Sequence, residues 1–387
     1  MKKRKHKQNL HNLRSLTIEI TDLSRSGAGV GHDENGRAIF VPFSAPGDTV
    51  EVKLTKAKAK FAEASIIKVI RPSSQRVKPH CTAFTACGGC QWQHIPYELQ
   101  WQTKLKGVQD SLQLNKVIAP ENWDTFPAGH LWHYRNRVQL RGDETGIGFF
   151  APQSNTLVPV ESCEIADQLI NTALPELRIE AKNKGKKFKV ELSTEPNGNV
   201  TKTWNQQHGA AGFRQVNDKQ NNNLRDWVQN NVEKDVAILD LFGGSGNLSK
   251  ALVHTTSQIH CIDVNVPEAA DDLPENFQFH QSSVMDWLKI SVPKTPDEEP
   301  NQAVKWIAII DPPRGGLAGD LTDTLKYLKK WKISEIILVG CKTDPWSRDI
   351  ARMLEQGWKL SKVAVFDFFP QTYHVETVAL LTRQIKK

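Results

Sequence analysis

The sequence lacks any uninterrupted apolar run of about 18 residues, the length that a membrane-spanning helix requires. The basic start, residues 1–5, is not followed by the apolar segment of a secretory signal. These absences predict a cytoplasmic protein with no membrane partner. Nothing in the sequence indicates an obligate protein partner, and the oligomeric state is not readable from it.

The phosphate-binding motifs of many nucleotide enzymes are absent too. There is no G-x-G-x-x-G pattern, and no glycine-rich loop carries a phosphate-binding lysine. A glycine turn does occur at residues 243–247, after an apolar strand at 236–242. Asp240, just before that turn, would repel a pyrophosphate, so the pattern argues against a dinucleotide.

The segment after the glycine turn is typical of a fold that holds a nucleoside. A short helix is expected over residues 248–253, and a second strand over 259–263 ends on Asp263. In doubly wound folds this order places an acid where it accepts hydrogen bonds from a ribose. Together with Asp311-Pro312-Pro313-Arg314 later in the chain, the pattern favours S-adenosylmethionine as the ligand.

Positive charge is concentrated near the N-terminus. Residues 1–80 contain 16 Lys/Arg and 7 Asp/Glu, whereas the rest of the chain contains 34 and 36. Clustered Lys and Arg suit a nucleic-acid backbone, because neutralising phosphates releases counterions. Nucleic-acid binding is therefore favoured, and a solvated basic tail beside an inert basic domain is the alternative.

Changes of pattern along the chain predict its domains. Short alternating segments at residues 16–70 predict a small closed barrel, and segments at 132–192 predict an antiparallel sheet. From residue 236 strands and helices alternate, which predicts a parallel sheet and an α/β fold class. We predict a disordered basic tail over 1–14, a barrel over 15–72, a central domain over 73–210 and an α/β domain over 211–387.

Three of the six cysteines lie within ten residues, in the pattern Cys81-x5-Cys87-Gly88-Gly89-Cys90. In a cytosolic protein such a cluster is more often metal-binding than disulfide-bonded. Glycines allow the loop to fold tightly around one centre, and Cys163 is the best candidate for a fourth ligand. Four sulfur ligands suit zinc or an iron–sulfur cluster, and the spacing does not separate the two.

Two reactive side chains near the C-terminus are also placed at the ends of strands. Cys341 follows the apolar run at residues 336–340, and Glu376 precedes the apolar run at 377–381. Open α/β sheets bind ligands at such ends. We therefore interpret Cys341 and Glu376 as candidate site residues, against the alternatives of an inert buried thiol and a surface carboxylate.

Taken together, these features resemble the RNA 5-methyluridine methyltransferase family over nearly the whole chain. The barrel segment is similar to a TRAM domain, an OB-like RNA-binding barrel. The resemblance is carried, in order, by Gly27 to Gly31 with Pro46-Gly47-Asp48, the cysteine cluster, Phe213-x-Gln215-Val216-Asn217, Asp240-Leu241-Phe242-x-Gly244-x-Gly246-Asn247, Asp311-Pro312-Pro313-Arg314, Cys341, and His374-Val375-Glu376.

The resemblance implies a Rossmann-like class I methyltransferase domain and S-adenosylmethionine-dependent methylation of uracil C5. In this chemistry a thiolate, here Cys341, adds to C6 and makes C5 nucleophilic, and Glu376 removes the C5 proton. The target base is expected to be extruded from its stack. A 23S rRNA substrate is favoured over tRNA because the barrel and the cysteine cluster occur together.

The resemblance also implies ligand-binding residues. The cysteines Cys81, Cys87, Cys90 and Cys163 correspond to the ligands of a 4Fe–4S cluster. The positions that correspond to cofactor contacts are Gln215, Phe242, Asn247, Asp263, Ser283 and Asp311. Arg314 is a candidate for contact with the extruded nucleotide or its phosphate.

Two departures from the family pattern stand out. The family often has Ser-Cys-Asn-Pro around the nucleophile, whereas this chain has Gly340-Cys341-Lys342-Thr343. Lys342 either lowers the pKa of the thiol or points to solvent. The helix that the family usually has after the ribose-binding acid is truncated here.

Three other functions are compatible with parts of the pattern. An amino-methyltransferase also uses Asp-Pro-Pro, but follows it with an aromatic residue where this chain has Arg314. A radical S-adenosylmethionine enzyme needs a C-x3-C-x2-C spacing that is absent. A catalytically silent RNA-binding protein predicts that Cys341→Ala has no effect on activity in the cell.

Overall fold

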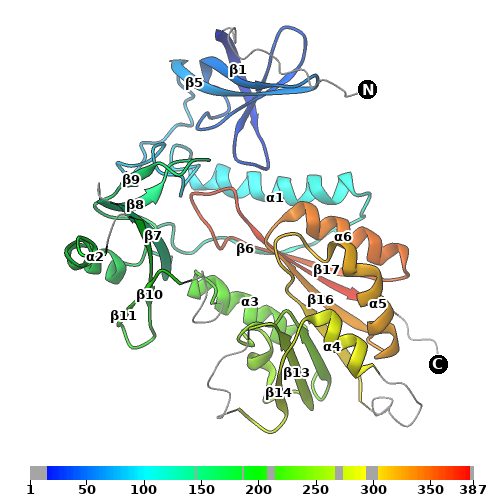
Figure 1. The fold of residues 1–387 in the computed structure, drawn as a ribbon. Coiled ribbons are helices and arrows are strands. Elements are labelled where there is room, and N and C mark those ends of the chain that lie inside the picture. Colours follow the sequence, from blue (N-terminus) through cyan, green and yellow to red (C-terminus); the bar gives the residue numbers. More distant parts are fainter. Residues whose placement is uncertain are drawn as a thin grey trace, which may run out of the picture. The chain divides into compact units, whose positions relative to one another are not determined.

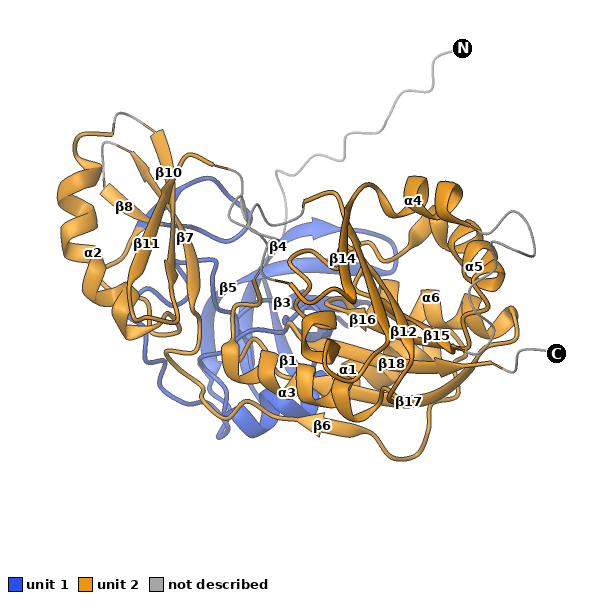
Figure 2. Ribbon diagram, turned by 90° about the horizontal axis from the view of Figure 1, so that it is seen from below, with its two compact units in different colours: residues 1–104, 149–158, 371–373 blue, residues 105–148, 159–370, 374–387 orange. Residues whose placement is uncertain are grey.

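The computed structural model describes residues 15–143, 146–184, 187–206, 214–265, 273–292 and 304–383. The predicted basic tail, Phe213 and most of the segment after Asp263 lie outside these ranges. Figure 2 shows two compact units, which are described separately below. Unit 1 contains residues 1–104, 149–158 and 371–373, and unit 2 contains 105–148, 159–370 and 374–387.

Unit 1 contains a closed five-stranded barrel, as the short alternating segments predict (Figure 1). Its strands follow the order β1-β2-β3-β5-β4. Their bounds are β1 (Ser15–Leu23), β2 (Gly29–His32), β3 (Ala38–Val41), β4 (Thr49–Ala57) and β5 (Phe61–Arg71). Alternation sends Ile18, Ile20, Val50 and Val52 into the barrel, where they are fully or almost fully buried.

A buried ion pair fixes the turn before β4. The carboxylate of Asp48 accepts hydrogen bonds from the backbone N–H of Ala45 at 2.6 Å and of Ser73 at 2.8 Å. Arg76 donates to both of its oxygens, at 2.8 and 2.7 Å. Burial raises the pKa of Asp48, but these hydrogen bonds outweigh it and the net shift is downward. The segment that leads to the cysteines is thereby held to the barrel.

Unit 2 is built on an eight-stranded sheet with the order β14-β13-β12-β15-β16-β18-β17-β6. Neighbouring strands are parallel except that β18 runs antiparallel to β16 and β17. The bounds are β6 (Asp124–Phe126), β12 (Ala237–Leu241), β13 (Gln258–Asp263), β14 (Phe277–Gln281), β15 (Trp306–Ile310), β16 (Glu335–Gly340), β17 (Lys359–Phe366) and β18 (Glu376–Thr382).

Every residue of β12 and β15 is buried, as expected for central strands covered on both faces. Helices α4, α5 and α6 lie along one side of this sheet (Figure 1). The helices of this part are α3 (Asp218–Asn230), α4 (Val284–Ser291), α5 (Leu321–Lys330) and α6 (Thr343–Glu355). No helix in the described ranges is long and apolar enough to cross a membrane.

The segment after the glycine turn is wound more tightly than predicted. The expected helix over residues 248–253 is a 3₁₀ helix at Ser249–Leu252. The hydroxyl of Ser249 donates to the buried carboxylate of Asp240 at 2.5 Å, which draws this turn close to the end of β12. A second 3₁₀ helix lies at Ala318–Asp320.

The remaining strands form a five-stranded sheet with the order β11-β10-β7-β8-β9. Strand β10 is antiparallel to β11 and to β7, and β7 is antiparallel to β8, as the sequence predicts. The bounds are α1 (Tyr97–Leu114), β7 (Arg137–Asp143), β8 (Gly146–Phe150), β9 (Leu157–Pro159), α2 (Gln168–Ala181), β10 (Lys187–Thr194) and β11 (Val200–Trp204).

An aromatic cluster around His260 packs beside β13. The His260 ring stacks on Trp306, with centroids 5.7 Å apart and planes inclined by 5°. Its Nδ1 lies 2.8 Å from Nε2 of His280, a hydrogen bond that requires one ring nitrogen to be unprotonated. Burial, followed by the charge of His280, lowers the pKa of His260 to about 4.

Acidification is expected to destabilise the protein partly through His260. Its pKa is lowered in the folded state, so its stabilisation is present above about pH 6.5 and is lost as the pH falls toward about 4. We expect about 1–2 kcal/mol of the free energy of unfolding to be lost over this range, a value discounted for the partial exposure of the ring. Urea denaturation at a series of pH values measures it.

His260→Gln is expected to flatten this pH dependence, because glutamine does not titrate. The matched control is His254→Gln, since His254 is exposed and lies near the same sheet. An unchanged pH dependence in His260→Gln would show that another group causes the loss.

Candidate active site at the carboxyl edge of the sheet

The predicted site residues gather where the parallel strands of unit 2 end. Strand order reverses between β12 and β15, because β13 continues on one side and β16 on the other. Open α/β sheets bind ligands outside the carboxyl ends of the strands at this switch point. Phe242 follows β12, Asp263 ends β13, and Asp311 follows β15.

The turn after β12 is closely packed and conformationally strained. Phe242 has a φ of 61°, which is rare for a residue other than glycine and is often found at functional sites. The next residue must be glycine, because a Cβ at Gly243 would lie 2.5 Å from Sγ of Cys261 and 2.6 Å from an oxygen of Asp240. The turn therefore places backbone that carries no side chain at the edge of the sheet.

Asp263 is held by backbone donors on both carboxylate oxygens. The N–H of Gly244 donates to Oδ2 at 3.0 Å, and the N–H of Asn265 donates to Oδ1 at 2.8 Å. Each carboxylate oxygen can accept a further hydrogen bond. Asp263 is therefore fixed in place and keeps the capacity to bind ribose hydroxyls.

Asn247 is fixed by a residue that the sequence did not reveal. The side-chain amides of Asn247 and Asn221 exchange two hydrogen bonds, at 2.8 and 2.9 Å. Asn221 lies on α3 and is buried, and a polar residue on the inner side of an amphipathic helix is the signal that could have identified it. The pair joins the glycine turn to α3.

The other two predicted cofactor residues differ in their surroundings. Gln215 is buried, and its carbonyl accepts a hydrogen bond from Asn136 at 3.0 Å. Ser283 is the N-cap of α4: its hydroxyl accepts from the N–H of Asp286 at 3.1 Å and lies 2.7 Å from the Asp286 carboxylate. The structure gives Ser283 a capping role, and its contact with a cofactor stays a prediction.

Buried acids make this part of the edge strongly electronegative. Burial raises the pKa of Asp240 to about 6, partly offset by hydrogen bonds from Ser249 and Cys261. Burial, together with the charges of Asp240 and Asp263, raises the pKa of Asp311 to about 7. A cationic ligand bound here would favour the ionised forms of these acids.

Cys341 and Glu376 are brought together by strand pairing. Strand β16 pairs with β18 in antiparallel register, and the last pair is Gly340 with Thr377. The hydroxyl of Thr377 also donates to the Gly340 carbonyl at 2.9 Å. One further step in this register sets Cys341 opposite Glu376, and residues directly opposite share one face of a sheet. Two residues 35 positions apart in sequence thus become neighbours.

The environment raises the pKa of both groups. Burial, together with the charges of Glu376 and Asp311, raises the pKa of Cys341 to about 11. Burial, then the charge of Asp311, raises the pKa of Glu376 well above its usual value; that side chain is 3% exposed. The guanidinium of Arg314 lowers the pKa of both groups. Arg314 is therefore close enough to favour a thiolate and a carboxylate.

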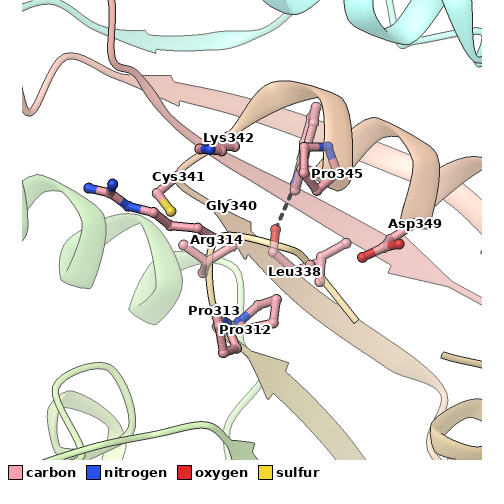
Figure 3. A pocket seen from close by; sticks show the side chains of 12 residues that line it. Pro312, Pro313, Arg314, Leu338, Gly340, Cys341, Lys342, Pro345 and Asp349 are labelled. Carbon is pink, nitrogen blue, oxygen red and sulfur yellow. Dashed lines mark hydrogen bonds between the residues drawn. The ribbon is translucent and has the colours of Figure 1, made fainter. Parts of the chain in front are cut away.

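Cys341 also opens onto a small hollow between the loop after β15 and the start of α6 (Figure 3). Pro312, Pro313 and Arg314 line one wall, and Gly340, Cys341 and Lys342 line another. A Cβ at Gly340 would lie 2.7 Å from the Trp346 side chain, which explains the glycine at this departure from the family pattern. The indole of Trp346 donates to the Leu338 carbonyl at 3.1 Å, so the helix start is fixed to β16.

The four predicted metal ligands belong to different units. Cys81, Cys87 and Cys90 lie in unit 1 and Cys163 lies in unit 2; each is half-buried and none is in a disulfide. The N–H of Gly89 donates to Sγ of Cys87 at 3.4 Å. Burial raises the pKa of Cys87, and the nearby charge of Cys81 adds to this. Within the described ranges, no three His, Cys, Asp or Glu side chains are arranged to hold a metal ion.

The strand order and the placement of acids at the switch point define unit 2 as a class I methyltransferase domain. Family models match two parts of the chain: the TRAM domain at residues 13–67, and tRNA (Uracil-5-)-methyltransferase at residues 302–384.

The chain is 28% identical to the 23S rRNA (uracil(1939)-C(5))-methyltransferase RlmD of Shewanella piezotolerans, over 94% of this chain and 95% of that protein. It is 28% identical to the Haemophilus influenzae enzyme of the same name, over 97% and 98%.

A similar fold occurs in the Pyrococcus abyssi tRNA (uracil-54, C5)-methyltransferase solved with S-adenosyl-L-homocysteine. The TM-score is 0.68 at 21% identity, over 95% of this chain and 99% of that one. By these matches the chain is similar to RNA (uracil-5-)-methyltransferases over nearly its whole length.

Gly243→Ala is expected to damage both folding and cofactor binding. The added methyl group would clash with Cys261 and Asp240, and overpacking of this kind costs about 1–3 kcal/mol. Urea denaturation measures the loss, and calorimetric titration with S-adenosylmethionine measures binding. Gly319→Ala is the control, because a Cβ there would meet no atom within 4 Å. Equal stability of the two variants would contradict the packing argument.

Proposed function

We propose that this protein methylates C5 of a uridine in 23S rRNA, with S-adenosylmethionine as methyl donor, Cys341 as nucleophile and Glu376 as general base. The observation that carries the proposal is the register of β16 and β18, which sets a thiol opposite a buried carboxyl group at the switch-point edge. An amino group needs no covalent activation before methylation, so this pair is better suited to carbon than to nitrogen.

The reaction starts with Cys341, because C5 of uracil is a poor nucleophile. The thiolate adds to C6 and pushes the ring electrons toward O4 and C5, which makes C5 an enolate carbon. The high pKa of Cys341 means that its thiolate, once formed, is strongly nucleophilic. Arg314 stabilises that negative charge.

S-adenosylmethionine supplies an electrophilic methyl group on a positively charged sulfur. Uracil C5 attacks that methyl carbon, so one C–C bond forms and one C–S bond breaks. Gln215, Phe242, Asn247, Asp263, Ser283 and Asp311 are proposed to contact the donor. The two acids among them, Asp263 and Asp311, favour its positive charge.

Glu376 completes the reaction. After methyl transfer C5 carries both a methyl group and a hydrogen, and the carboxylate removes that hydrogen as a proton. The electron pair re-forms the C5–C6 double bond and expels the Cys341 thiolate. Because burial raises its pKa, Glu376 is a stronger base than an exposed glutamate.

The two proposed roles predict different fates for the covalent intermediate. Glu376→Gln is expected to accumulate a methylated protein–RNA adduct on ordinary uridine RNA, since the C5 proton cannot be removed. Cys341→Ala is expected to form no adduct, and to lose methylation by at least about 10³-fold. Denaturing gels with methyl-labelled S-adenosylmethionine and unmodified 23S rRNA measure both, and the first uridine to map is the one equivalent to position 1939.

The possible outcomes test the substrate and the catalytic mechanism separately. An adduct with tRNA and none with 23S rRNA would retain the mechanism and change the substrate. Methylation by Cys341→Ala, in protein that binds S-adenosylmethionine normally, would overturn the nucleophile and favour an amino-methyltransferase.

We also propose that Cys81, Cys87, Cys90 and Cys163 hold a 4Fe–4S cluster. Three thiols on one short loop, none of them in a disulfide, and an N–H directed at Cys87 suit sulfur ligation. The role of the cluster would be structural, and no step of methyl transfer passes through it.

Protein purified without oxygen is expected to contain about four iron atoms and four acid-labile sulfides per chain. Cys87→Ala is expected to lose both, whereas Cys261→Ala, outside the loop, is expected to keep them. Elemental analysis and visible absorption measure this. Stoichiometric zinc without sulfide would replace the cluster by a zinc site, and wild-type protein without any metal would overturn the proposal.

A further inference from the structure

Lys342 is an exposed cation directly beside the proposed nucleophile. It lines the same hollow as Cys341 and Arg314, and Figure 3 shows these three side chains grouped at one end. Neither Lys342 nor Arg314 has an ion-pair partner among the described residues. Within the described part of the chain, the hollow therefore presents two cationic side chains that form no ion pair.

The acidic residue that lines the hollow, Asp349, already has hydrogen-bond and ion-pair partners. Asp349 accepts a hydrogen bond from the backbone N–H of Leu317 at 2.7 Å, and it pairs with Arg348 at 2.8 Å. Its side chain is 1% exposed and lies away from Lys342 (Figure 3). The field at the mouth of the hollow is thus positive, which suits an anion.

Lysine is an unfavourable choice for this position on structural grounds. Lys342 is the N-cap of α6, with extended backbone angles and no side-chain hydrogen bond to the helix. Asparagine, serine or aspartate would cap these N–H groups and add about 1 kcal/mol of stability. A positive charge at a helix N-terminus is also repelled by the helix dipole. A residue that the local structure disfavours is a candidate for a functional role.

The chemistry of a nucleotide indicates which anion belongs there. In the usual anti conformation of a pyrimidine nucleotide, C6 is the ring atom that faces the 5′-phosphate. A thiol that reaches C6 therefore lies near that phosphate. The residue next in sequence is within a lysine side chain's reach of it, because adjacent Cα atoms are about 3.8 Å apart.

We propose that Lys342 binds the 5′-phosphodiester of the target uridine and so positions C6 over Cys341. The proposal rests on the uracil C5 methylation proposed above. Lys342 is a substrate-binding residue in this scheme, with Arg314 on the facing wall of the hollow. It takes no part in the covalent steps.

Lys342→Gln is expected to lower kcat/KM about tenfold, as for one lost charged contact, and Lys342→Arg is expected to retain most activity. The slope of log affinity against log salt concentration should fall by about one. Lys359→Gln is the matched control: Lys359 is an exposed lysine at the start of β17, at the opposite edge of the sheet. S-adenosylmethionine affinity, measured by calorimetry, should be equal in all variants.

A chemical control tests the contact itself. A short 23S rRNA fragment with an uncharged methylphosphonate 5′ to the target uridine removes the phosphate charge without changing the protein. With this substrate the kcat/KM of Lys342→Gln should be close to that of the wild type, because the substitution and the uncharged linkage remove the same interaction.

The outcomes distinguish this proposal from the one on which it rests. Wild-type methylation with Lys342→Gln equal to Lys359→Gln would overturn the role of Lys342 alone. A tenfold loss that persists with the uncharged linkage would overturn it as well, since the contact would not be to that phosphate. A wild-type enzyme that methylates no uridine RNA would overturn both proposals.

Discussion

The antiparallel pairing of β16 with β18 is the constraint on which the site depends. Apart from β18, the neighbouring strands of this sheet are parallel. The N-terminal end of the one reversed strand, β18, therefore lies at the same edge as the C-terminal ends of the parallel strands. Glu376, at the start of β18, therefore faces Cys341, just after β16. Without the reversal, the carboxyl group and the thiol would lie at opposite edges. Gly340 permits this arrangement, because Trp346 packs where its side chain would be.

Charge is divided along the same edge in the order of the strands. Asp240, Asp263 and Asp311 lie at the ends of β12, β13 and β15. Burial raises the pKa of Asp240 and Asp311, so a nearby cation would favour their ionised forms. Arg314 and Lys342 lie beyond them, beside β16. In the proposed reaction, a cationic methyl donor and an anionic RNA strand would therefore have separate electrostatic partners, with Cys341 and Glu376 between the two.

Much of this edge could be predicted from sequence because the signals are local. A buried strand shows as an apolar run, and the residue after it is assigned to the carboxyl edge without knowledge of the whole fold. That logic identified Asp311, Cys341 and the barrel strands. It missed Asn221, whose function depends on a contact with Asn247 across 26 positions. It also predicted a regular helix where the contact of Ser249 with Asp240 gives a 3₁₀ turn.

The charges around Cys341 favour one of the two alternatives for Lys342. The cation that lowers the pKa of Cys341 is Arg314, which stands on the opposite wall of the hollow. Thiol activation therefore has a source other than Lys342, and an idle lysine would not be expected at a helix N-cap, where it costs stability. Because Lys342 is exposed next to the proposed nucleophile, the substrate RNA is the partner that best accounts for its positive charge. In this scheme Arg314 favours the thiolate of Cys341, and Lys342 positions the RNA strand. Each cation can therefore vary between enzymes without disabling the function of the other.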